Sequence, residues 1–170
     1  MANTYTLLAS VTVGSGGATS IDFNSIPQTT YTDILVKLCV RTDNTNGTPN
    51  LRINGSTTSY SGIYLAGNGS SMASGSSNTT YLDLLGLEGP TQTSNTFTNT
   101  EFYIPGYLNA TYKSVLIDSV SENNASLVDT ALISGLWSNT SAISSLSIRP
   151  TGATNFVQYS TAYLYGIKTS

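Results

Sequence analysis

Apolar and polar side chains alternate most clearly in one stretch of this sequence, Asp33-Ile34-Leu35-Val36-Lys37-Leu38-Cys39-Val40-Arg41. Every second residue from Ile34 to Val40 is aliphatic, and the charges of Asp33, Lys37 and Arg41 fall on the positions between them. Successive side chains of a β-strand point to opposite faces, so a period of two is typical of a half-buried strand. The stretch therefore predicts a strand whose charges lie on its outer face.

The same period of two recurs along most of the chain. Near the start, alternate residues form one apolar face: Tyr5, Leu7, Ala9, Val11 and Val13. The residues between them are polar, with Leu8 as the exception. Near the end of the sequence, alternate residues of 157–167 also share one face. Eight shorter strand-like runs lie elsewhere along the chain, at residues 19–23, 51–54, 60–66, 81–85, 97–104, 114–121, 130–137 and 143–149. These eleven short runs, without clear helical segments, predict an all-β fold. We expect one antiparallel β-sandwich domain over residues 1–170, jelly-roll-like in topology.

Asn and Gly mark the turns between these runs. Asn54-Gly55 predicts a hairpin, because both residues tolerate positive φ, and Asn46-Gly47 and Asn68-Gly69 repeat the signal. Residues 67–80 and 92–99 are low in complexity, and their composition predicts flexible surface loops. We expect Ser and Thr chiefly on outward-facing strand positions.

The composition excludes several classes of function. Ser, Thr, Asn and Gly make up 81 of the 170 residues, whereas there are 6 Lys and Arg, 9 Asp and Glu, one Cys and no His. Without His there is no Ser-His-Asp or Cys-His catalytic unit and no imidazole metal ligand. A net charge of −3 supplies no cationic surface for nucleic acid. No apolar run approaches the roughly 20 residues that span a bilayer, and no signal-peptide pattern is present, so we expect no membrane partner and synthesis in a cytoplasm.

Two groups of oxygen-bearing residues resemble sites. Residues 43–47 open like a calcium loop, but Gly stands one position early and Asn54 occupies the place of the bidentate Glu, so a turn is the better interpretation. The acidic residues Glu101, Asp118, Glu122 and Asp129 are the remaining candidates for glycan hydrolysis. Asp118 and Glu122 share a strand face about 13 Å apart, which is too far for a glycosidase pair. Solvated charges are the favoured interpretation, and a hydrolase is the least favoured function.

The remaining candidates are a thiol and the aromatic residues. Cys39 lies between two cations in sequence, which favour a reactive thiolate, but a lone Cys is usually a packing residue. Several tyrosines in or beside turns, together with Trp137, are candidates for contact with a partner or for stacking on sugars: Tyr60, Tyr64, Tyr81, Tyr103, Tyr107 and Tyr112. We predict no catalytic residue, no cofactor-binding residue and no metal ligand.

Five stretches carry a resemblance to a known group of proteins. Residues 20–36 (SIDFNSIPQTTYTDILV) resemble a recurring opening among small virion proteins of tailed phages that infect marine bacteria and cyanobacteria. Four later stretches are similar to the same group: residues 103–107 (YIPGY), 120–125 (VSENNA), 135–143 (GLWSNTSAI) and 158–167 (QYSTAYLYGI). The resemblance implies a phage structural protein, either a capsid decoration (cement) protein or a tail or fibre component.

The sequence has no heptad stalk or anchoring helix, which favours a compact protein that docks on a lattice. We therefore expect a non-enzymatic capsid decoration protein in the virion, a homotrimer that binds major capsid subunits and stabilises the head. The alternative is a tail fibre or spike component or a carbohydrate-binding receptor module.

Overall fold

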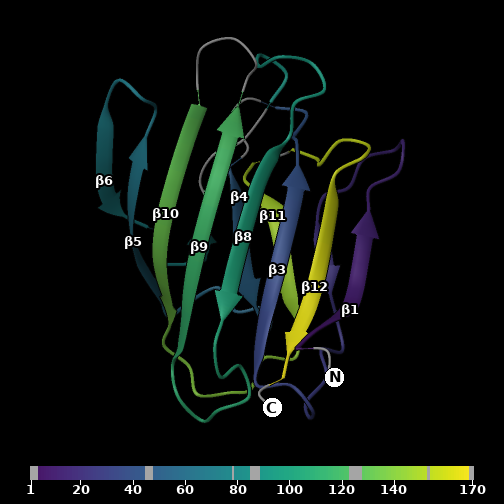
Figure 1. Cartoon of the computed structure of the whole chain (residues 1–170), viewed down its shortest axis with the longest axis vertical. Coiled ribbons are helices and arrows are strands. Elements are labelled where there is room, and N and C mark those ends of the chain that lie inside the picture. Colours follow the sequence, from purple (N-terminus) through teal and green to yellow (C-terminus); the bar gives the residue numbers. More distant parts are fainter. Residues whose placement is uncertain are drawn as a thin grey trace.

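The computed structural model describes residues 4–44, 48–77, 79–84, 89–122, 128–152 and 154–168, and these residues form strands, turns and loops without a helix (Figure 1). The strands are β1 (Tyr5–Thr12), β2 (Ile21–Phe23), β3 (Asp33–Val40), β4 (Pro49–Ile53), β5 (Tyr60–Gly67), β6 (Met72–Ser76), β7 (Leu82–Asp83), β8 (Thr98–Ile104), β9 (Lys113–Glu122), β10 (Val128–Trp137), β11 (Leu146–Pro150) and β12 (Thr161–Ile167). Within these ranges there is no helix of the length and apolarity needed to cross a membrane.

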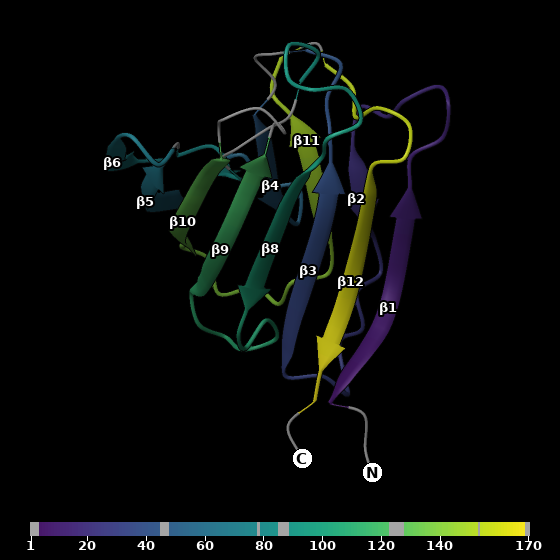
Figure 2. The same cartoon turned by 45° about the horizontal axis from the view of Figure 1, so that its top comes forward.

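The strands form two antiparallel sheets. The large sheet has eight strands in the order β1-β12-β3-β8-β9-β10-β5-β6, and the small sheet has four in the order β2-β11-β4-β7. Figure 2 shows the small sheet packed against one face of the large sheet. The prediction of an antiparallel β-sandwich is therefore confirmed.

The topology is a jelly roll with two insertions. When β5–β6 and β9–β10 are set aside, two four-stranded sheets remain, β1-β12-β3-β8 and β2-β11-β4-β7. Along the chain, every connection between these eight strands crosses from one sheet to the other, except the one from β4 to β7. That is the double-sheet, Greek-key path of a jelly roll. The inserted strands extend the large sheet beyond β8.

The hydrophobic core fills the space between the sheets. Its side chains include Val36, Leu38, Phe102, Ile104, Ile117 and Ile133 from the large sheet and Ile21, Phe23, Leu51, Ile53, Leu82 and Ile148 from the small sheet. The small sheet reaches as far as β10, where a Cβ at Gly135 would lie 2.8 Å from the Leu82 side chain. A side chain on Gly135 would therefore displace the Leu82 side chain from its place in the core.

The strand predicted at residues 33–41 is confirmed over Asp33–Val40, but the expectation that Arg41 lies on its outer face is wrong, because Arg41 is buried and bonded to backbone carbonyls. The strand near the start also needs a correction. In β3, Ile34, Val36, Leu38 and Val40 are buried and Lys37 is exposed. In β1, Leu7 lies opposite Tyr165 and Ala9 lies opposite Leu164, so β1 advances by two residues where β12 advances by one, and Leu8 is the extra residue of a β-bulge. The bulge reverses which alternate residues of β1 face outward. The predicted single apolar face is therefore wrong, because Tyr5 and Leu7 are exposed on the outer face.

Three other expectations about strands and turns are corrected. Residues 67–80 contain β6, which pairs with β5 around Asn68-Gly69, so this segment is more than a loop. The last strand begins at Thr161, because Val157 to Ser160 form a turn. Asn54-Gly55 is a turn with positive φ at both residues, but it is a corner between sheets and not a hairpin, since β4 and β5 belong to different sheets.

Hydroxyl side chains also lie in the interior. Thr100 and Ser119 face each other across β8 and β9, both buried, with their hydroxyl oxygens 2.9 Å apart. Thr98 and Ser121 are buried as well. The expectation that Ser and Thr lie chiefly on outward positions is therefore incomplete, because a pair of hydroxyls satisfies its own hydrogen bonds inside the sandwich.

Candidate functional site on the outer face of the large sheet

The outer face of the large sheet carries a row of mainly apolar and aromatic side chains, interrupted by Ser134 on β10. Strand register places these residues side by side in the order Leu7, Tyr165, Leu35, Tyr103, Leu116, Ser134 and Ile63, from β1 to β5. Leu116 keeps 63% of its surface exposed and Ile63 keeps 66%. We call these seven residues, together with Tyr5, Leu65 and Leu132 on the same face, the outer band.

The neighbouring row of the same face holds the charges. Lys37, Glu101 and Asp118 lie directly opposite one another on β3, β8 and β9, and Leu132 and Leu65 continue the row on β10 and β5. The Lys37 ammonium lies 2.8 Å from the Glu101 carboxylate. This hydrogen bond and the charge of Glu101 raise the pKa of Lys37 above its ordinary value. A small charged cluster thus lies beside the mainly apolar row of the same face.

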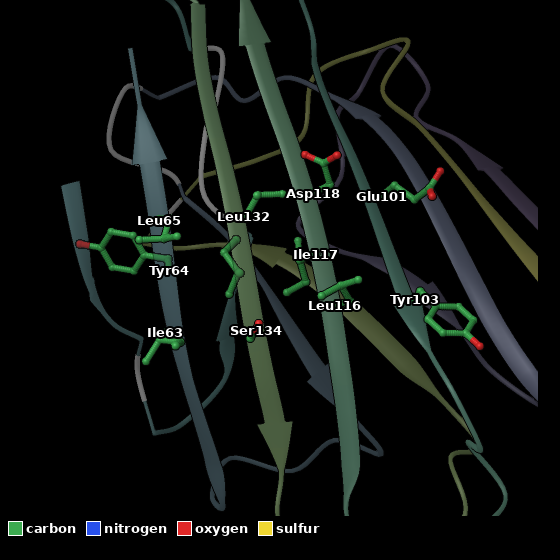
Figure 3. A pocket seen from close by; sticks show the side chains of 11 residues that line it. Ile63, Tyr64, Leu65, Glu101, Tyr103, Leu116, Ile117, Asp118, Leu132 and Ser134 are labelled. Carbon is green, nitrogen blue, oxygen red and sulfur yellow. The ribbon is translucent and has the colours of Figure 1, made fainter. Parts of the chain in front are cut away.

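A groove of about 520 Å³ crosses the inserted half of this face (Figure 3). Its lining includes Ile63, Leu65, Leu116 and Leu132, with Tyr103, Glu101 and Asp118 toward β8. A second hollow of about 500 Å³ shares Glu101 and Asp118 and continues toward Lys37 and Thr130. The outer band is therefore indented where its aliphatic side chains are most exposed.

The Tyr103 ring is held in place by Asp33. The tyrosine hydroxyl donates to one carboxylate oxygen at 2.7 Å, and the other oxygen accepts from the Gly106 N–H at 2.8 Å. The hydrogen bond to the carboxylate favours the neutral phenol and raises the pKa of Tyr103 to about 12. One side of the groove is thus a fixed aromatic ring rather than a freely rotating one.

The structure brings two of the four predicted carboxylates together. Glu101 and Asp118 are directly opposite each other on β8 and β9. Asp129 lies opposite Ser121, which is buried on the inner side of β9, so Asp129 is on the other face of the sheet. Glu122 ends β9, and its side chain lies outside the described part of the structure. Strand order, which the sequence does not reveal, creates the Glu101–Asp118 pair.

The Glu101–Asp118 pair lies on an open surface. Glu101 is engaged by Lys37, and its side chain is 48% exposed. Glycosidases place their two carboxyl groups on either side of a bound sugar. Two like charges on adjacent strands, one of them paired with a cation, are suited instead to recognising a complementary charge on a partner.

The aromatic candidates divide into buried and exposed groups. Trp137 is 2% exposed and stacks on buried Tyr60 with ring centroids 6.5 Å apart, so neither ring meets a ligand. Tyr107 is also buried, and its hydroxyl donates to the Pro27 carbonyl. The hypothesis of ligand contact is therefore wrong for these three residues. Tyr64, Tyr81 and Tyr103 are half-buried, and Tyr112 is exposed.

The hypothesis of a reactive thiolate at Cys39 is contradicted. Burial raises the pKa of the half-buried thiol. The two cations near it in sequence are engaged elsewhere, Lys37 with Glu101 and Arg41 with backbone carbonyls. The calcium-loop candidate is only partly described, since residues 45–47 lie outside the described ranges, and Asp43 accepts hydrogen bonds from Asn155.

The described residues offer no metal site, and the chain has no match among known proteins. Across the described ranges, no three His, Cys, Asp or Glu side chains are grouped so that they would hold a metal ion. Comparison with protein-family models, with curated proteins and with solved structures found no match to this chain.

Proposed function

We propose that this protein is a structural protein of a tailed-phage virion, a capsid decoration protein that binds major capsid subunits through the outer band and stabilises the head. The observation that carries the proposal is the mainly apolar row that runs across seven strands from Leu7 to Ile63, in which Leu7, Leu116 and Ile63 are each more than half exposed. Contiguous exposed apolar surface of this kind marks protein interaction sites. The resemblance of residues 20–36 and of the later stretches supports the virion setting.

The outer face is large enough for a stable interface. Eight strands at spacings of about 4.8 Å, each about seven residues long at about 3.3 Å per residue, give a face of roughly 800 Å². A standard interface buries about that area on each partner. The face therefore supplies a complete docking surface without further segments of the chain.

The charged cluster supplies orientation. Lys37, Glu101 and Asp118 lie between apolar residues in one row, so a partner with complementary charges is positioned in one register. Low overall charge limits repulsion when many copies lie side by side on a shell. In this proposal the chain is made in the host cytoplasm, forms a homotrimer that matches the local three-fold symmetry of the capsid, and becomes part of the virion.

The decisive experiment measures binding to heads assembled without this chain. The purified protein is titrated onto such heads and bound protein is measured after sedimentation. We expect saturable binding, and at least about a 100-fold loss for Leu116→Asp/Leu132→Asp, since central apolar contacts dominate interface energies. Asn24→Asp adds a charge at an exposed position next to β2 of the small sheet, away from the outer face of the large sheet, and is the control that retains binding.

Two results would overturn this function. Wild-type binding by the Leu116→Asp/Leu132→Asp variant would remove the outer band as the docking surface. Density for the protein only at the tail of the intact virion would instead support the tail fibre or spike alternative. Mass photometry of the purified protein tests the trimer separately, and a stable monomer would contradict it.

A further inference from the structure

A second pocket lies away from the outer band, at the end of the sandwich that is uppermost in Figures 1 and 2. There the end of β3 meets the loop before β8 and the turn before β12. The pocket has a volume of about 390 Å³, and its lining includes Asp43, Asn95, Phe97, Gln158 and Tyr159. Pockets of this size accommodate small ligands.

One wall of the pocket is fixed by a buried arginine. The Arg41 guanidinium donates to the backbone carbonyls of Thr93 and Thr96 at 2.8 Å each, of Gly89 at 2.6 Å and of Gln92 at 3.2 Å. Arg41 is only 9% exposed. Residues 89–97, predicted in part to be a flexible loop, are therefore held by hydrogen bonds to the buried Arg41 guanidinium. The wall that carries Asn95 and Phe97 is thus preorganised.

The opposite wall presents an aromatic ring from a strained backbone. Tyr159 has a φ of 72°, a conformation that is rare for bulky residues, and its N–H donates to the Val13 carbonyl at 3.0 Å. Its side chain is 68% exposed. Asn95, on the facing loop, also has positive φ, at 66°. Strained residues that the surrounding structure holds in place cluster at binding sites.

Several polar side chains of the pocket can bond a ligand. The side chains of Ser94, Asn95 and Gln158 have no hydrogen-bond partner within the described ranges. Asp43 accepts hydrogen bonds from the Asn155 backbone and side-chain N–H groups, both at 2.8 Å, which lowers the pKa of its carboxyl. Asp43 is thus ionised at neutral pH and fixed in orientation, while the positive charge of Arg41 is directed inward.

We propose that this pocket binds a neutral saccharide, with one sugar face stacked on Tyr159 and the hydroxyl groups bonded by Asp43, Asn95 and Gln158. An exposed ring offers a flat surface to the C–H face of a sugar, and amide and carboxylate groups complement vicinal hydroxyls. An acidic sugar or a phosphate would meet the Asp43 carboxylate without a free cation in the described lining. The inference is independent of the capsid proposal, because the two surfaces share no residue.

Saturation-transfer NMR with the full-length protein tests the proposal. The probes are the methyl glycosides of glucose, galactose, mannose and N-acetylglucosamine, with glucuronic acid and sialic acid as acidic comparisons. We expect at least one neutral sugar to bind with a Kd of about 1 mM, the range of a weak single-site contact, and the acidic sugars to bind less well. A folded wild-type protein that binds no neutral probe, or that prefers an acidic one, overturns the proposal.

Variants locate the site. Tyr159→Gly removes the ring and suits the positive φ, so the fold is retained, and we expect at least about a tenfold loss of affinity. Gln158→Ala should weaken binding several-fold. Tyr112→Ala removes another exposed tyrosine outside the pocket and should bind as the wild type does. Unchanged binding by Tyr159→Gly would contradict the assignment, whereas retained binding by Leu116→Asp/Leu132→Asp would show that the pocket acts independently of the outer band.

Discussion

The two faces of the large sheet are built from the same strands but differ in what covers them. Phe102 and Tyr103 are consecutive residues of β8, and Phe102 is fully buried against the small sheet whereas Tyr103 lies on the outer face beside exposed Leu116. The inner face is apolar because a second sheet packs on it. The outer band is apolar with no cover among the described residues, which is the physical reason to look for a partner there.

Phe102→Ala tests the inner face and carries the largest expected effect. Phe102 has no exposed surface and lies between Val36 and Ile117 in register, so truncation leaves a cavity in the core. We expect a loss of about 3–5 kcal/mol in the free energy of unfolding, measured by guanidinium denaturation. Leu116→Ala on the outer face is the control, with a change of about 0.5 kcal/mol or less. Equal effects for the two variants would contradict the assignment of the faces.

The hydroxyl pair inside the sandwich should show a different pattern. Thr100→Val or Ser119→Ala alone leaves the remaining buried hydroxyl without its partner, which costs about 1–3 kcal/mol of unfolding free energy. Replacing both removes the unsatisfied group, so the double variant should be more stable than either single one. A double-mutant cycle by urea denaturation measures this coupling, and additive losses would argue against it.

On the outer face, the ionisation of Tyr103 reports its contact with Asp33. Its pKa of about 12 lies above the ordinary value of 10 because the carboxylate accepts the phenol hydrogen. The contact therefore stabilises the fold fully below pH 10 and loses this contribution as the pH rises toward 12. Asp33→Asn should shift the pKa back toward 10, as followed by NMR of ¹³C-labelled tyrosine with Tyr103→Phe for assignment. An unchanged titration would mean that the contact is absent in solution.

The Lys37–Glu101 ion pair should have the smallest effect on stability. Both side chains are about half exposed, so solvent screens the pair and its coupling is expected to be about 1 kcal/mol or less. The pKa of Lys37 is raised, so this contribution is present at neutral pH and lost as the pH rises through that value. A cycle of Lys37→Met and Glu101→Gln, repeated at low and high salt, measures it. Coupling well above this range would indicate a pair shielded from solvent.

Sequence reasoning predicted the sandwich and most strands because alternation is a local signal. It did not predict the reversal of phase at Leu8, since a bulge depends on pairing with β12. It also missed β6, because small polar residues in Met72–Ser76 have little strand preference and become a strand only by pairing with β5. Local composition thus predicts a strand well where large apolar side chains alternate, and poorly where pairing with a neighbouring strand determines whether the segment is a strand.

The candidate sites show the same limit more strongly. Alternation identifies two faces of a strand but not which of them packs on the second sheet, so the outer band could not be assigned from Leu116 or Tyr103 alone. Glu101 and Asp118 become neighbours only through the order β8-β9. Arg41 looked like a surface charge in the alternating stretch, yet its backbone-carbonyl partners come from residues about 50 positions later.

The place of β1 in the large sheet has a consequence for biogenesis. Its strand partner is β12, so Tyr5 pairs with Ile167 only after the residues between them have left the ribosome. The β8-β9-β10 meander, by contrast, pairs strands that follow one another in sequence and are available early. Among the described strands, β1 is therefore the one whose partner is farthest away in the sequence. Until β12 has been made, the apolar residues of β1 and its backbone hydrogen-bonding groups lack their native strand partner, which favours aggregation of the nascent chain.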